Sequence, residues 1–166
     1  MVVQITTLPF FILHYSLYIK KMLYYFLALL TGAAVSVQSG VNSQLRQGLG
    51  NPVFAALISF GTGFLSLILF QSIMRGPAPA LEALRTLDWW KWTGGLLGAV
   101  YVTTVIVVIP RIGAASMLSL SVAGQLIAAV LLDHYGWLGF QQHSASLWRL
   151  VGVTMIILGA VIVVKN

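Results

Sequence analysis

Few residues in this sequence could do covalent chemistry. The chain has no cysteine, so it offers no disulfide, thiolate nucleophile or cysteine metal ligand. Its acidic residues and histidines are Glu82, Asp88, Asp133, His14, His134 and His143. Only Asp133 and His134 are adjacent, and with His143 they share one connecting segment that lacks a nucleophile and a full set of metal ligands. We therefore predict no enzyme, no catalytic residue, no metal site and no cofactor.

The residues best suited to binding a solute are amides within long apolar segments. Gln38 and Asn42 are four residues apart and so share one helix face, and Gln125 lies near the middle of another apolar segment. Polar side chains in lipid are costly unless they face a partner or a wet cavity, so we predict that these three contact a substrate. The alternative is that the amides only tie helices together, each contributing about 0.5 to 2 kcal/mol. The sequence does not separate these two interpretations.

The composition requires a bilayer around these segments. Hydrophobic residues make up 59% of the 166 residues and charged ones 7%, whereas about a quarter of a soluble domain is charged. The nine basic residues, in a net charge of +6, are scattered between apolar runs. That pattern is typical of helix-end anchors and positive-inside loops, whereas nucleic-acid binding needs a clustered patch. The predicted partner is the lipid bilayer, with no nucleic acid.

Apolar runs of about 20 residues, enough to cross roughly 30 Å of hydrocarbon, indicate the membrane spans. They occur at residues 22–41, 52–74, 89–109, 114–132 and 148–164. The runs do not alternate polar and apolar residues, so we predict an all-α, polytopic bundle of five transmembrane helices. Residues 110–113 are predicted as a turn because Pro110 cannot extend a helix interior.

Two longer connections join the spans. Residues 75–88 contain most of the acidic residues and two prolines, which indicates a water-exposed loop or a short interfacial helix. Residues 133–147 form the other connection. Asp133, at its start, could carry a proton or make a helix-terminating hydrogen bond. Threonines 103 and 104 can bond their own helix backbone, so we assign them a structural role.

Residues 1–21 stand apart from the spans. Their apolar part is short for a span and contains Pro9 and His14, and Lys20 and Lys21 follow it. A secretory signal has the opposite order, so that assignment is excluded. We expect an N-terminal extension that is interfacial or partly inserted, or a start codon assigned too early with Met22 as initiator. The transmembrane domain is then residues 22–166.

The odd number of spans suggests half of a larger assembly. Five spans place the two termini on opposite sides of the membrane, so a second, inverted copy would produce the repeat architecture of many secondary transporters. Basic residues favour an inside N-terminus, but a start at Met22 leaves them almost evenly split and makes both orientations accessible. Small residues recur every four positions, as in Gly32, Ser36 and Gly40, which favours close packing within the chain over a dimer contact.

Several short motifs, weak singly but specific in combination and order, carry a family resemblance. They are Gln38-Ser-Gly-Val-Asn42-Ser-Gln-Leu45, Ser59-Phe-Gly-Thr-Gly63, Gly94-Gly-Leu-Leu-Gly98, Pro110-Arg-Ile-Gly-Ala114, Val122-Ala-Gly-Gln-Leu126 and Leu132-Asp-His-Tyr-Gly136. From Met22 to the C-terminus the chain resembles the YdcZ-like five-helix proteins of the drug/metabolite transporter superfamily, distant relatives of the small multidrug resistance proteins.

The resemblance implies a multi-pass protein of the bacterial inner membrane that exports a small molecule. It implies a homodimer, or a pair with a paralogous five-helix partner, equivalent to a ten-helix transporter. We expect any solute site near the midplane, between spans one and four of paired subunits. The small multidrug resistance proteins use a glutamate on their first helix, where this chain has Gln38 and Asn42, and no span contains an acidic residue. Proton-coupled export of organic cations is therefore not expected.

The leading hypothesis is a transport subunit that works by alternating access around Gln38, Asn42 and Gln125. The rival hypothesis is a non-transporting accessory or structural membrane protein whose amides only pack helices.

Overall fold

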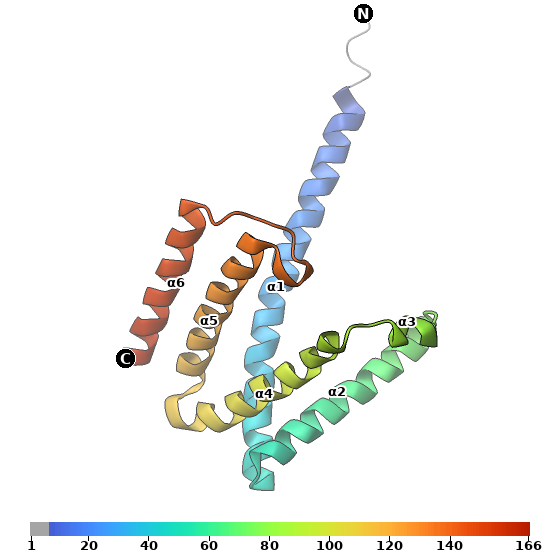
Figure 1. Ribbon diagram of the computed structural model, residues 1–166. Coiled ribbons are helices and arrows are strands. Elements are labelled where there is room, and N and C mark those ends of the chain that lie inside the picture. Colours follow the sequence, from blue (N-terminus) through green and yellow to red (C-terminus); the bar gives the residue numbers. More distant parts are fainter. Residues whose placement is uncertain (1–6) are drawn as a thin grey trace, which may run out of the picture. The chain divides into compact units, whose positions relative to one another are not determined.

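The computed structural model describes the backbone of residues 7–166 and the side chains of Tyr15 and residues 17–166. Its elements, shown in Figure 1, are α1 (Thr7–Leu49), α2 (Pro52–Met74), α3 (Leu81–Arg85), η1 (Trp89–Trp92), α4 (Thr93–Ile112), α5 (Ala114–Tyr135), η2 (Trp137–Gly139) and α6 (Leu147–Lys165). No strand occurs in residues 7–166. The all-α prediction is confirmed.

Five segments are long and apolar enough to cross a membrane. They are Leu17–Leu49, Pro52–Met74, Trp89–Ile112, Ala114–Tyr135 and Leu147–Lys165. The predicted spans all fall within these segments, because a run of apolar residues satisfies its backbone in lipid only as a helix.

The first helix is longer than the predicted span. α1 begins at Thr7, continues through Lys20 and Lys21, and ends at Leu49 instead of near residue 41. Polar residues after Val41 end an apolar run but do not break a helix, and the first breaker is Gly50 with a φ of 65°. Residues 1–6 of the predicted extension lie outside the described residues, and residues 7–21 are helical.

The chain divides into two compact units, one ending at Gln38 and one running from Ser39 to Asn166. The second unit contains the end of α1 and all later elements. In it, α2 packs on α4, α4 on α5, and α5 on α6. Its core cluster consists of Ala55, Ala56 and Ile106, with Leu45 and Val102 packed against it. Small residues on α2 let α4 approach closely, which drives helix association in lipid.

The predicted turn at residues 110–113 is wrong in its extent. α4 continues through Pro110 and Arg111 to Ile112, and the chain reverses at Gly113 alone. Gly113 has φ 83° and ψ 157°, a conformation that is essentially restricted to glycine. A membrane helix tolerates proline when another group satisfies the carbonyl that the proline leaves without a donor.

The connection at residues 75–88 contains one short helix, α3, and is exposed throughout. This agrees with the predicted loop or short helix. At its end the Asp88 carboxylate forms an ion pair of 2.9 Å with Lys91. The hydrogen bond from Lys91 and its positive charge lower the pKa of Asp88. Both side chains are exposed, so this pair contributes little to stability.

Candidate functional site

The buried polar side chains of the described residues all lie on α1. They are Ser39, Asn42 and Ser43, which are 4%, 4% and 9% exposed. Arg46 continues the same helix face at a spacing of three to four residues and is half-buried. We call Ser39, Asn42, Ser43 and Arg46 the polar face of α1. The whole set belongs to the second unit.

Arg46 joins this face to the proline-containing helix. Its Nη1 donates a hydrogen bond of 3.2 Å to the backbone carbonyl of Ile106 on α4. In a regular helix that carbonyl would accept from the N–H of residue 110, but position 110 is proline and has no N–H. The guanidinium thus satisfies a carbonyl that the helix cannot satisfy, at a residue whose side chain is fully buried.

The positive charge of Arg46 has no acidic partner within the chain. Asp88 pairs with Lys91 and Asp133 pairs with Arg149. Glu82, the remaining acidic residue, lies on the exposed helix α3 and makes no ion pair. All acidic residues of the sequence are among the described residues. The polar face of α1 is therefore a site of uncompensated positive charge.

The predicted substrate-binding residues occupy different environments. Asn42 is buried on the polar face of α1, whereas Gln38 is exposed and belongs to the first unit. Gln125 is exposed on α5, and its side chain makes no hydrogen bond to any of residues 17–166. No hydrogen bond in this part of the chain joins the three amides, and their binding role stays a prediction.

Sequence reasoning missed Ser43 and Arg46 as site residues. The three- to four-residue spacing of Ser39, Asn42, Ser43 and Arg46 could have indicated a shared polar face. From the sequence alone, Arg46 is one of the basic residues that indicate membrane orientation. A basic residue near a helix end usually extends toward water, and its inward hydrogen bond depends on a neighbouring helix.

Asp133 lies in a tightly bonded connection between α5 and α6. Its carboxylate accepts a hydrogen bond of 2.8 Å from Arg149 Nη2, and its backbone carbonyl accepts one of 2.8 Å from the His143 N–H. His134 Nδ1 accepts a hydrogen bond of 3.2 Å from the N–H of Ala145. These contacts give Asp133 a structural role in joining the last two helices. Among the described residues, no group of three or more acidic residues and histidines could hold a metal ion.

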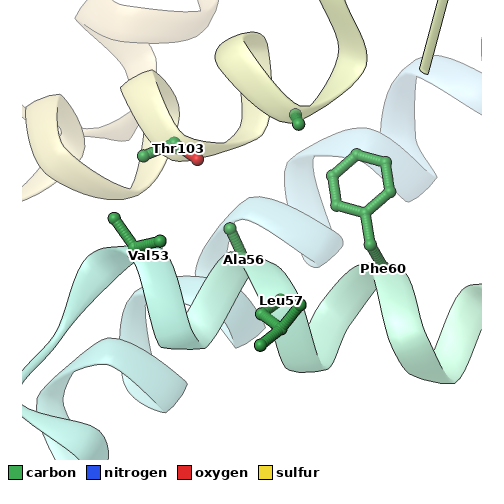
Figure 2. Close-up of a pocket in the computed structure, with 6 residues that line it drawn as sticks. Val53, Ala56, Leu57, Phe60 and Thr103 are labelled. Atoms are coloured by element: carbon green, nitrogen blue, oxygen red, sulfur yellow. The ribbon is translucent and has the colours of Figure 1, made fainter. Parts of the chain in front are cut away.

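An apolar cavity of about 200 Å³ lies between α2 and α4. In Figure 2, Val53, Ala56 and Phe60 point from α2 toward α4, where Thr103 supplies the one polar group of the lining. Leu57 and Ala99 complete the lining. This environment suits a hydrocarbon chain better than a polar solute.

The Arg46 hydrogen bond predicts an energetic coupling between α1 and Pro110. We expect Arg46→Gln to lower the free energy of unfolding by about 1.5 to 3 kcal/mol, since it removes a charged donor from a buried carbonyl. Pro110→Ala supplies a backbone N–H that can donate to the Ile106 carbonyl. In a protein with this change, Arg46→Gln should therefore lower the free energy of unfolding by about 1 kcal/mol less than it does alone. Unfolding of the unchanged protein, the two single variants and the double variant in mixed detergent micelles measures this coupling. Strictly additive costs would contradict it.

Comparison with known proteins places these residues in a family. The family described as "Putative inner membrane exporter, YdcZ" matches residues 23–162, a region that contains Asn42, Arg46 and Gln125. The protein named Inner membrane protein YdcZ of Escherichia coli (strain K12) is 30% identical over 142 residues, covering 81% of this chain and 90% of that protein. No solved structure matches the chain.

Proposed function

The chain belongs to the YdcZ family of multi-pass inner membrane proteins, and we propose that it is a transport subunit that exports a small molecule by alternating access. In this proposal it acts as a homodimer or with a paralogous five-helix partner, because five spans form half of an inverted-repeat transporter. The rival function is an accessory membrane protein whose amides only pack helices.

The exposure of Gln125 is the observation that carries the proposal. Its amide lies within the span Ala114–Tyr135 and has no hydrogen-bond partner in residues 17–166. Leaving an amide unpaired in an apolar medium costs about 2 to 7 kcal/mol. A second subunit or a water-filled path removes that cost, and both are expected of a dimeric transporter.

The exposure of α2 also supports a partner. Residues 61–74 of this helix are all exposed, so much of its length is not buried by the other helices of the second unit. Apolar side chains there can face lipid, but Gly61, Thr62 and Ser66 would also let a neighbouring helix approach closely.

The proposed path uses the polar face of α1 and Gln125. Arg46 bonds the Ile106 carbonyl of α4, a helix that is weakened at Pro110, and Asn42 lies on the same face of α1 as Arg46. α4 in turn packs on α5, which carries Gln125. Small shifts of α4 could therefore alter both polar sites together, as alternating access requires. Gln38 stays a predicted additional contact.

A spin label at position 125 tests the proposal directly. Because the chain has no cysteine, the label attaches only at the cysteine introduced there. We expect a label on Gln125→Cys to lie near the same label on a second copy of the chain, across a subunit interface, or to be accessible to a water-soluble nickel chelate. Electron paramagnetic resonance in proteoliposomes measures both distance and accessibility.

A label on Met155→Cys is the matched control, since this exposed side chain of α6 is apolar and lies in a span that the proposed interface does not use. It should be accessible mainly to oxygen dissolved in the lipid. If the label at position 125 also contacts only lipid, and no second label is near, the proposed path and interface are wrong.

A further inference from the structure

We propose that Arg46, together with Asn42 and Ser43, binds an anionic group of the exported solute, a carboxylate or a phosphate. This inference rests on the proposed function and names the substrate class of the same site. The residues share one face of α1, at spacings of three and four positions.

Arg46 supplies the charge. One of its N–H groups bonds the Ile106 carbonyl, and no other hydrogen bond or ion pair of its guanidinium occurs within residues 17–166. A guanidinium carries several donors in a planar fork that matches carboxylate and phosphate oxygens. The donors left over can therefore bind an anion without breaking the contact to α4.

Asn42 and Ser43 supply neutral donors beside this charge. Asn42 is 4% exposed, and its amide makes no hydrogen bond to another residue of the described part of the chain. No side-chain nitrogen or oxygen among the described residues is both buried and unpaired, so the amide of Asn42 reaches the surface of the chain, where its N–H groups can donate to a ligand oxygen. The hydroxyl of Ser43, also buried, lies one residue further along the helix.

The charges elsewhere in the chain favour an anion over a cation. The acidic residues lie in connections or at a helix end, and two of the three are paired with basic residues. An organic cation approaching the polar face of α1 would meet Arg46 with no carboxylate to offset it. Charges are weakly screened in a low-dielectric site, so the guanidinium strongly repels a cation and strongly attracts an anion.

Anion binding at Arg46 also acts on α4. Because Pro110 leaves the Ile106 carbonyl without a backbone donor, that carbonyl stays bonded to the guanidinium, and an anion that shifts the guanidinium shifts the donor of this carbonyl with it. The bound and empty states then favour different arrangements of α4. Such differential stability is what a transported ligand must supply to shift the protein between states.

The test measures binding of benzoate, inorganic phosphate and benzyltrimethylammonium to the full chain in nanodiscs. The discs contain phosphatidylcholine alone or phosphatidylcholine with phosphatidylglycerol, at constant ionic strength. We expect benzoate or phosphate to raise the unfolding temperature in neutral discs, and Arg46→Gln to weaken this binding at least about tenfold. Arg46→Lys should bind with intermediate affinity, because it keeps the charge but loses the planar fork.

Two variants separate binding from structure. Arg46→Gln combined with Pro110→Ala restores a backbone donor for Ile106, so it should fold normally and still fail to bind the anions. Arg111→Gln removes an exposed arginine whose side chain makes no hydrogen bond or ion pair within residues 17–166, and it should bind as the unchanged protein does.

The other outcomes overturn the inference, the transport proposal or both. Stabilisation that comes only from phosphatidylglycerol and requires Arg46 would place a lipid headgroup in the site. Stabilisation by benzyltrimethylammonium that survives Arg46→Gln, or anion binding independent of Arg46, would show that the substrate class is wrong. Flux that does not depend on Arg46 would contradict the inference but leave the transport proposal standing. Anion binding that depends on Arg46, without any flux, would contradict transport but leave the inference standing.

Discussion

Replacing Gln125 with leucine is expected to abolish export while each subunit still inserts and folds. The side chain is exposed and bonds no residue of its own described chain, so its loss should leave the packing of one subunit unchanged. If the amide lines the path, an interaction with the solute disappears, and flux should fall by at least about tenfold, equivalent to about 1.4 kcal/mol. Efflux of benzoate or of ethidium from proteoliposomes measures this, whichever compound the unchanged protein moves.

The matched control is Gln141→Leu, the same substitution in the exposed connection between α5 and α6. It should leave flux unchanged. Retained flux in Gln125→Leu would remove this residue from the path. Loss of folding or insertion would instead favour the rival function, in which the amide only holds helices together. An unchanged protein that moves neither compound would count against transport.

Replacing Ala55 with leucine is expected to destabilise the second unit more than any surface change. Ala55 is completely buried and forms the core cluster with Ala56 and Ile106, whose side chain is also fully buried. Helices in lipid associate through close contact, so a larger side chain forces α2 and α4 apart. Overpacking of this kind costs about 1 to 3 kcal/mol.

Unfolding in mixed detergent micelles, followed by circular dichroism, measures the loss. Ser72→Leu is the matched control on the same helix, since Ser72 is exposed and bonds only the carbonyl of Ile68. It should change the free energy of unfolding by less than about 0.5 kcal/mol. Equal stability of the two variants would mean that α2 and α4 do not pack through this cluster.

The span pattern could be predicted because it depends on local properties. Each apolar run must be helical in lipid, whatever its neighbours are, so composition and length were sufficient for the five spans. The end of α1 was not predicted, because a decline in hydrophobicity marks the membrane boundary and not the end of a helix. The extent of α4 was missed because the donor that replaces the missing N–H of Pro110 comes from a distant residue, Arg46.

The candidate site was predicted only in part for the same reason. Residue types alone specify the class of the protein, its spans, its family resemblance and Asn42 as a polar group in a membrane helix. Tertiary packing adds which side of α1 is buried, that Arg46 bonds α4, and that Gln125 has no partner among residues 17–166. Burial and pairing depend on which helix lies alongside, and an apolar sequence contains little information about that because lipid and protein are similarly apolar neighbours.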